Sequence, residues 1–505
     1  MPRPASAAPP GPVGAPGVPP AVRAWAQALG TALSGIVTMI AVAALGLWAA
    51  GATDLPGGAF PSVVAAAVVI AAGGTVGLSG EAGIIAQGAA ALDAVPLSVT
   101  LAGALVVAAF FLLPLRHRAV AGTQELLGRI ARTTVCWLVL LLLVALAARH
   151  DFRISVGNDL VDELGAEFGT TPTVGFHADL GATLGFGLLW VLALLVLTFL
   201  VSRRAPLSSR LLHFQDSVRP PAFAMLCILL AYVAIGLVAG IVELITGEHP
   251  ADTFAVLCLG LPNLAWMALG IGIGGAWTGH VDKAIGLPMP QVLDDILRTG
   301  HGPRTLDLGA IAEHDGRAWL LVAVAVVVLS AAAFLAAVRS PARLPAWRPA
   351  VELAVALALT LLVVGLLTRI YAHYGLSLIG VGDLGGNLGG EVVLQPQLLR
   401  LVGVGAAWGL VTGYLGSLLG RRVRHPGEVG ERRQASRQRP RNIGVAQLGG
   451  GGGTDVGGGG GVVARAGPAS VLTCVFRCPR WGGCVSSAAL RPAARSAATN
   501  PRQVS

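Results

Sequence analysis

Residues 71–83 read AAGGTVGLSGEAG and directly follow the apolar run AFPSVVAAAVVI at 59–70. Glycine lacks a Cβ and relaxes helical backbone, so this cluster marks a place where a membrane helix can end or turn. Two interpretations are open. The segment either crosses the bilayer as an ordinary helix that uses glycine for close packing, or it turns back to the face from which it entered. This choice decides the topology of the whole chain.

The composition is typical of a polytopic membrane protein. Of 505 residues, 54% are hydrophobic and only 12% are charged, and the mean hydropathy is +0.73. A helix needs about 18 or more apolar residues to span a hydrocarbon core of about 30 Å. Ten runs are candidates, at 28–50, 59–78, 95–115, 133–148, 182–201, 221–242, 251–276, 318–338, 350–368 and 401–419. We expect an all-α transmembrane bundle of about ten hydrophobic helices, because the alternating pattern of a β-barrel is absent.

Three phrases recur in the same order at a separation near 220 residues. They are FLLPLRHRA (111–119) with FLAAVRSPA (334–342), ISVGNDL (154–160) with LIGVGDL (378–384), and Trp190 with Trp408, each thirteen residues ahead of an arginine pair. In so biased a composition one match would be noise, whereas three in order indicate a duplication of five segments plus five. Such repeats are common in transporters but also occur in membrane proteins that transport nothing.

The predicted organisation has four parts. Residues 1–24 form a Pro/Ala-rich arm that we expect to be disordered, and residues 25–205 form the first membrane repeat. Residues 206–425 form the second repeat. Residues 426–505 are a glycine-rich, basic tail without periodicity, which we also expect to be disordered.

The distribution of basic residues bears on the topology. If all ten segments cross, the two sides carry 12 and 14 basic residues, which is no bias. If the second and seventh segments enter and leave on one face, the inner side carries 18 and the outer side 8, as the positive-inside rule requires. The seventh segment has features that interrupt helices, namely a Pro262–Asn263 break followed by four glycines. After the second segment, IIAQGAAAL (84–92) provides a short second apolar piece. Ten full crossings remain the simpler count, and both schemes stay open.

Two loops have a distinct character. The loop at 149–181 carries six acidic residues and is expected to be a solvated loop on the outer face. The stretch MPQVLDDILRTG (289–300) places apolar and acidic residues on opposite faces of a helix, so it is expected to lie along the membrane surface.

The sequence carries no pattern that predicts chemistry. It has no GxxxxGK[ST], HExxH or GxSxG motif, and its cysteines lack the spacing of a zinc site. We therefore predict no enzyme activity and no catalytic, cofactor-binding or metal-binding residues. The net charge of +9 comes from arginines in loops and the tail, so the expected partner is the lipid bilayer and not nucleic acid.

Several long phrases resemble the streptophobe family, which comprises large hydrophobic integral membrane proteins of Streptomyces and related actinobacteria. They include AVAALGLWAAGATDLPGGAFPSVVAA, FAMLCILLAYVAIGLV and VALALTLLVVGLLTRIYAHYGLSLIGVGDLGG, and the resemblance covers about residues 22–429. It implies a multi-pass plasma-membrane protein of unknown molecular function, with no catalytic residues to carry over. After Gly430 the chain departs from the short basic ending usual in that family.

Two functions compete at this stage. The first is a non-enzymatic scaffold or partner-binding component of the cell envelope. The alternative is a channel or transporter of an uncharged solute or lipid through the repeat interface. A transporter should have a polar cavity at mid-depth, bounded by Gly73–Gly83 and Pro262–Gly275, whereas a tightly packed interior there would oppose transport.

Overall fold

The computed structural model describes nine stretches of the chain, namely residues 19–82, 86–114, 123–153, 173–201, 209–281, 304–340, 345, 347–378 and 390–437. The expected surface helix at 289–300 lies outside the described residues. So do most of the N-terminal arm, the middle of the acidic loop and the glycine-rich part of the tail.

The described part is mostly helical, which confirms the polytopic bundle. The first half contains α1 (Pro20–Ala49), α2 (Phe60–Ala71), α3 (Leu97–Leu112), α4 (Thr123–Ala147) and α6 (Leu180–Val201). The second half contains α7 (Ser209–Thr246), α8 (Pro250–Gly272), α11 (Trp319–Arg339), α12 (Trp347–Leu367) and α14 (Leu398–Arg437). Short helical pieces are η1 (Ala52–Asp54), η2 (Pro56–Gly58), α10 (Leu308–His314) and η4 (Gly316–Ala318). Eight of the helices are long and apolar enough to cross a membrane.

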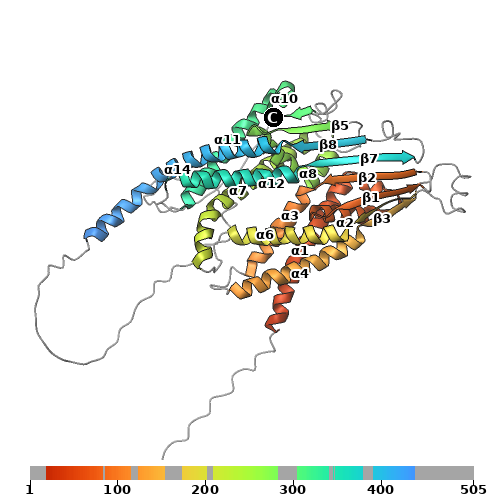
Figure 1. Cartoon of the computed structure of the whole chain (residues 1–505), viewed down its shortest axis with the longest axis horizontal. Helices are drawn as coiled ribbons and strands as arrows, with labels where there is room; N and C mark the ends of the chain where they lie inside the picture. The colour runs from red at the N-terminus through yellow and green to blue at the C-terminus, as the bar shows by residue number, and fades with distance from the viewer. Residues whose placement is uncertain are drawn as a thin grey trace, which may run out of the picture. The chain divides into compact units, whose positions relative to one another are not determined.

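The bundle carries an antiparallel sheet of eight strands that the sequence did not predict (Figure 1). The strands are β1 (Val76–Ala82), β2 (Ala86–Ala94), β3 (Arg149–Arg153), β4 (Thr173–Ala178), β5 (Trp277–Val281), β6 (Arg304–Leu306), β7 (Ile370–Leu378) and β8 (Gly390–Pro396). Their order is β3-β4-β1-β2-β7-β8-β5-β6. The interpretation of residues 84–92 as a second apolar piece of a broken helix is wrong, because residues 86–94 form β2.

The sheet joins the two halves of the chain. β2 from the first half pairs with β7 from the second half over nine residue pairs, from Ala86 with Leu378 to Ala94 with Ile370. The other neighbours in the sheet are paired within one half. The main-chain ladder between β2 and β7 therefore connects segments almost 300 residues apart.

The sheet lies at one end of the bundle (Figure 1). Strands begin where α2, α4, α8 and α12 end, and strands lead into α3, α6, α10 and α14. A sheet outside the bilayer lies on one side of it, so an even number of crossings must separate any two of its strands. Three helices, α6, α7 and α8, separate β4 from β5. One of them does not cross, and ten full crossings are incompatible with this sheet.

Contacts near both ends of α8 favour it as the helix that does not cross, although its other face packs along α7, where Trp266 Nε1 donates to the carbonyl of Leu229 at 3.2 Å. A Cβ added to Gly46, near the end of α1, would lie 2.9 Å from the Cβ of Cys258 in α8. A Cβ added to Gly272, at the end of α8, would lie 2.7 Å from the carbonyl oxygen of Leu321 in the first turn of α11. Gly46 and Leu321 both lie at helix ends on the sheet side. α8 therefore runs along this side of the bundle, although its length alone would allow a crossing.

α2 follows the same path in the first half. It has 12 residues, about 18 Å, and cannot span the hydrocarbon core. It begins just after Gly57, where an added Cβ would lie 3.2 Å from Nε2 of His150 in β3, and it ends beside β1. With α2 and α8 on the sheet side, we infer eight crossings, through α1, α3, α4, α6, α7, α11, α12 and α14. This set differs from the eight longest apolar helices, because α8 is left out and α3, with 16 residues or about 24 Å, is counted as a short crossing.

Exposed tryptophans mark two levels along the bundle. Trp25 is 48% exposed and Trp48 is 61% exposed; both lie on α1, about 35 Å apart by helical rise. Trp319 lies at the sheet-side start of α11, and Trp347 lies at the opposite end, at the start of α12. Tryptophan prefers the headgroup level, so these side chains outline the slab that the lipid occupies.

The ends of the crossing part differ from the sequence boundaries. α1 begins at Pro20, inside the arm that was expected to reach residue 24. α14 continues to Arg437, twelve residues past the expected end of the second repeat at 425. The apolar part of α14 nevertheless ends at Gly420, where the arginine-rich stretch starts.

Candidate functional site at the glycine turns

α2 and α8 both end in a glycine turn that leads into the sheet. Gly73 and Gly274 have positive φ angles of 90° and 99°, which side chains with a Cβ rarely adopt. The next glycine in each turn donates back to the helix, from Gly74 N to Val69 O at 2.9 Å and from Gly275 N to Gly270 O at 2.8 Å. This is the usual glycine cap of a helix C-terminus. The glycines therefore end both segments and direct the chain into a strand.

The expected helix break at Pro262 and Asn263 is wrong. α8 continues through Pro262 from Pro250 to Gly272, and the chain leaves the helix only after Gly272. The helix tolerates the proline because neighbouring groups satisfy the backbone next to it, as described below.

Each glycine turn is held against the last helix of its own half. The amide of Asp179, just before α6, donates to the carbonyl of Thr75 at 3.0 Å. The amide of Gln397, just before α14, donates to the carbonyl of Ala276 at 2.9 Å. The two turns are therefore fixed by equivalent main-chain bonds.

The tryptophans that recur in the sequence are used differently in the two halves. Trp408 Nε1 donates to the carbonyl of Ile273 at 3.0 Å and so caps the end of α8. Trp190 instead stacks on Trp137 of α4, with ring centroids 4.8 Å apart. The positions correspond, but only the second half uses the indole to hold the glycine turn.

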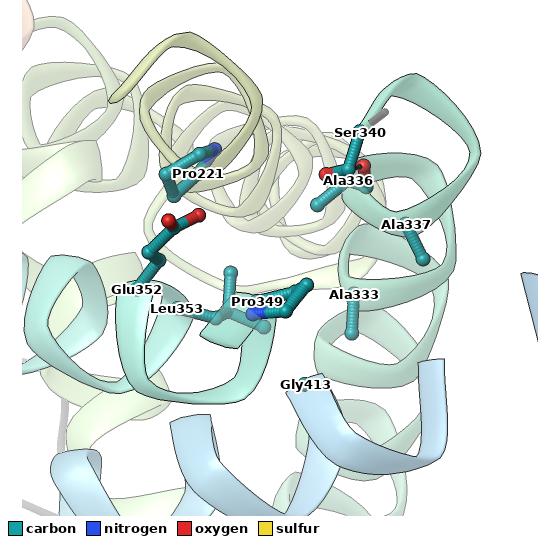
Figure 2. A pocket seen from close by; sticks show the side chains of 9 residues that line it. All are labelled: Pro221, Ala333, Ala336, Ala337, Ser340, Pro349, Glu352, Leu353 and Gly413. Carbon is teal, nitrogen blue, oxygen red and sulfur yellow. Dashed lines mark hydrogen bonds between the residues drawn. The ribbon is translucent and has the colours of Figure 1, made fainter. Parts of the chain in front are cut away.

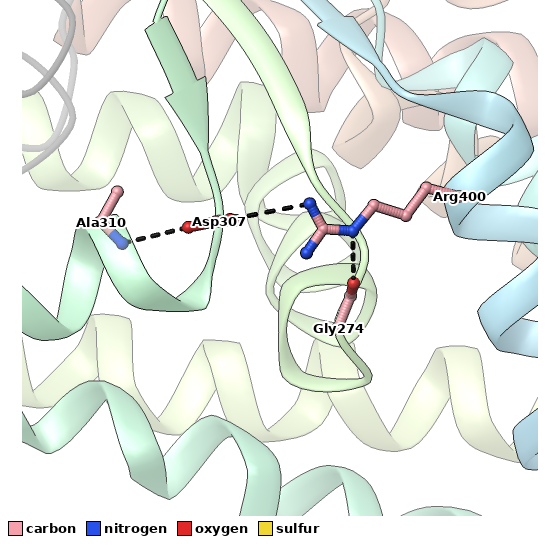
Figure 3. A network of polar contacts seen from close by, with 4 residues as sticks. All are labelled: Gly274, Asp307, Ala310 and Arg400. Carbon is pink, nitrogen blue, oxygen red and sulfur yellow. Dashed lines mark hydrogen bonds and ion pairs between the residues drawn. The ribbon is translucent and has the colours of Figure 1, made fainter.

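A polar network fixes the turn after α8 (Figure 3). Arg400 Nε donates to the carbonyl of Gly274 at 3.0 Å, and Nη1 of the same guanidinium lies 3.6 Å from Oδ2 of Asp307. The other oxygen of Asp307 accepts from the amide of Ala310 and caps α10. A cation at a helix C-terminus satisfies carbonyls that have no partner within the helix. Arg400 thereby ties together α8, α10 and α14.

The two halves meet at a polar joint between α3 and the middle of α8. Ser98 Oγ donates to the carbonyl of Leu257 at 2.9 Å and accepts from the amide of Leu261 at 3.1 Å. One residue past Pro262, the side chain of Asn263 accepts from the amide of Leu97 at 3.2 Å and donates to the carbonyl of Val95 at 3.0 Å. The joint thus satisfies backbone groups both at the proline of α8 and at the connection from β2 to α3.

The surroundings of the second glycine turn are tightly packed. Leu269 and Trp277 are fully buried, and an added Cβ on Gly270 would contact the ring of Trp277. An added Cβ on Gly275 would lie 2.8 Å from Cδ1 of Leu401. Among the described residues of this turn, side chains occupy the space that a transport cavity would need.

A small cavity lies between the end of α11 and the start of α12 (Figure 2). It has room for about one water molecule and is lined by Pro221, Ala333, Ala336, Ala337, Ser340, Pro349, Glu352, Leu353 and Gly413. The carboxylate of Glu352 points toward Pro221 in this view. Glu352 lies in the second turn of α12.

No family model, curated protein or solved structure matches this chain.

The arrangement positions backbone and side chains but assembles no reactive centre in the described residues. Within that part of the chain, no three histidine, cysteine or acidic side chains lie together where they could hold a metal ion. Cys136, Cys227 and Cys258 are free thiols on membrane helices. What the site offers is a rigid connection between the glycine turns, the two halves and the sheet.

Sequence reasoning missed Ser98 and Arg400, the residues that make this connection. Ser98 sits two residues after Pro96 at the start of an apolar run, and Arg400 sits just before another run. A polar residue at the start of a membrane helix is usually at the headgroup level, so neither position stood out.

Proposed function

We propose that this chain is a non-enzymatic scaffold or partner-binding component of the plasma membrane, of the streptophobe kind, that displays a rigid sheet on one side of the bilayer. The observation that carries the proposal is the ladder of nine residue pairs between β2 and β7. Alternating-access transport requires the two repeats to move relative to one another. Such movement would break this ladder and the joint at Ser98 and Asn263, so the halves are better suited to a fixed frame.

The sheet faces outward in this proposal. With eight crossings, the loops on the sheet side hold 8 basic residues, and the opposite side, with the N-terminal arm and the start of the tail, holds 18. Basic residues accumulate on the cytoplasmic side of plasma-membrane proteins. The sheet is thereby available to partners in the cell envelope.

The two halves are proposed to derive from a duplication. The same order of helix, helix, two strands, helix, helix, two strands and helix occurs twice, with the short α10 added in the second half. The main-chain bonds from Asp179 to Thr75 and from Gln397 to Ala276 occupy corresponding places. Strands of the first half fill one side of the sheet, and strands of the second half fill the other.

A flux measurement distinguishes the scaffold from the alternative of a channel or transporter. The full chain is reconstituted in liposomes, and swelling is followed after a gradient of urea, glycerol or sorbitol is applied. We expect the same rates as in liposomes without protein. A protein-dependent flux that is lost in Gly270→Leu, which would fill the packed region further, would overturn the scaffold and favour transport.

A second measurement tests partner binding directly. A photoreactive amino acid replaces Thr305, an exposed residue of β6, in the full chain expressed in cells. The control position is Arg23, an exposed residue at the start of α1, on the side of the bundle opposite the sheet. We expect one reproducible adduct from position 305 and none of that size from position 23. Absence of any adduct from position 305 and from Asp54, another exposed sheet-side position, would contradict a partner-binding sheet.

A further inference from the structure

β3 forms the edge of the sheet on the side of the first half. It pairs with β4, and no other described strand lies beside it (Figure 1). An edge strand presents main-chain N–H and C=O groups that its own sheet does not use. β3 starts at Arg149, just after the end of α4, so this edge begins close to the membrane boundary.

The main-chain bonds of the sheet show which residues of β3 face outward. The amide of Ala178 in β4 donates to the carbonyl of Ala148 at 3.2 Å, and the register of β3 continues from this bond. In an antiparallel pair, successive residues direct their N–H and C=O groups alternately toward the neighbouring strand and away from it. The even-numbered residues of β3 therefore face β4. The odd-numbered residues, with Asp151 at the centre, direct their N–H and C=O groups to the edge.

The exposed side chains of this edge have opposite charges. Arg149 and Asp151 are two positions apart in the strand, so both side chains lie on the same face of the sheet, and both are exposed. Gly175 lies opposite Asp151 in β4, and a Cβ at this glycine would contact the carboxylate. The glycine thus leaves room for the charge. A strand with the opposite order of charges would be attracted at both positions, whereas like charges directly opposite each other are destabilising.

We propose that this edge binds an extended segment of a partner protein, which adds a ninth strand antiparallel to β3. The segment carries a basic residue opposite Asp151 and an acidic residue opposite Arg149, and so reads basic-x-acidic from its own N-terminus. The antiparallel direction follows from the sheet, whose neighbouring strands are antiparallel throughout, and from the greater stability of that pairing. In strand addition, main-chain bonds supply affinity and side chains supply selectivity. This partner class rests on the proposed function, because the sheet must face outward to meet a protein of the cell envelope.

A second copy of this chain does not fit the edge. The strands run away from the bundle, so a two-fold axis that keeps both copies in one membrane runs along the strands (Figure 1). This symmetry places Arg149 level with the same arginine of the second copy, and Asp151 level with the same aspartate, so like charges meet. An antiparallel pairing of two copies would instead place the second bundle beyond the sheet, outside this membrane. The occupant is therefore a different protein.

The experiment uses the purified full chain in detergent and two fluorescent peptides of the same composition, TVTKVEVTV and TVTEVKVTV. Binding is followed by fluorescence anisotropy. The first peptide places its lysine opposite Asp151 and its glutamate opposite Arg149 when it pairs antiparallel to β3. We expect the unmodified chain to bind TVTKVEVTV several-fold more tightly than TVTEVKVTV, because only the first forms two attractive cross-strand pairs in that direction.

Two variants separate the side chains from the backbone. R149E/D151R exchanges the charges, keeps the net charge, and should reverse the preference between the peptides. Asp151→Pro removes an N–H that faces the edge and no bond to β4, a position where an edge strand tolerates proline. It should bind both peptides several-fold more weakly than the matched control Asp151→Thr, which keeps this N–H.

Three results would overturn strand addition at β3. They are equal affinity of the unmodified chain for the two peptides, no binding of either peptide, and an unchanged preference in R149E/D151R. If a variant does not accumulate, the preference of the unmodified chain decides. A failure here is distinct from a failure of the scaffold. An adduct from position 305 without a peptide preference would keep the partner-binding sheet and reject this edge, whereas a protein-dependent flux would overturn the scaffold whatever the peptides do.

Discussion

The hydroxyl of Ser98, in the first half of the chain, lies 2.9 Å from the carbonyl oxygen of Leu257, in the second half. Oγ of Ser98 also accepts from the amide of Leu261 at 3.1 Å. One side chain of α3 thus bridges one turn of α8 next to its proline. This joint and the ladder between β2 and β7 are the polar connections that hold the halves together in the described structure.

Removing the hydroxyl of Ser98 should destabilise the protein. Ser98→Ala leaves the carbonyl of Leu257 and the amide of Leu261 without this partner, at a cost of about 1–3 kcal/mol. Ser34→Ala is the matched control, because Ser34 donates within its own helix to the carbonyl of Thr31. Thermal unfolding in detergent should show a lower midpoint for Ser98→Ala only. Equal midpoints for the two variants would mean that the joint is not holding the halves.

Alanine at the glycine turns should be unfavourable. Gly73→Ala and Gly274→Ala place a Cβ at a positive φ, which costs on the order of 1 kcal/mol. Gly260→Ala in α8 is the control, since nothing lies within 4 Å of its added Cβ and alanine favours a helix. Unfolding midpoints should fall for the two turn variants and stay constant or rise for the control. A higher unfolding midpoint for Gly274→Ala would show that this residue does not keep its positive φ in the membrane.

A large side chain at Gly46 should separate α1 from α8. An added Cβ there would lie 2.7 Å from Cγ of Leu259, so Gly46→Leu requires a shift of packed helices. Overpacking of this kind costs about 1–3 kcal/mol, or more where the backbone cannot move. Gly30→Leu on the same helix meets open space and should be tolerated. The amount of folded protein after size-exclusion chromatography measures the effect, and equal recovery of both variants would argue against the contact.

Labelling of single cysteines tests the path of α8. In a chain without its native cysteines, Glu248→Cys lies just before α8 and Thr305→Cys lies after β5, and both positions are exposed. A maleimide that cannot cross the membrane should label both from the same side, whereas Arg23→Cys at the start of α1 should react only from the other side. Labelling of positions 248 and 305 from opposite sides would mean that α8 spans the membrane, and the eight-crossing topology would be wrong.

The predictions about the membrane helices succeeded because they depend on local properties of the chain. The length and polarity of an apolar run are enough to indicate a helix in lipid, and eight such helices are present. The glycines after residue 70 and after residue 272 correctly marked helix ends, because a helix cap depends on the conformation of a few neighbouring residues. The predicted break at Pro262 was wrong because it also relied on a local tendency. Ser98 of α3 bonds to the backbone beside this proline, and the helix continues.

The strands could not be predicted in this way. β2 reads AQGAAALDA, which has few of the β-branched or aromatic residues that favour strands, and it resembles a piece of membrane helix. It becomes a strand because β1 and β7 supply main-chain partners on both sides. One of those partners comes from the other half of the chain, and no local pattern reveals it.

The sequence by itself determined that this protein is a helical membrane bundle and that two of its apolar segments end at glycines. It left open whether those segments cross. Only the tertiary structure decided this, because a single sheet assembled from both halves requires an even number of crossings between its strands. The glycines of AAGGTVGLSGEAG cap a helix of 12 residues, which is too short to span the hydrocarbon core, and lead the chain into a strand of that sheet.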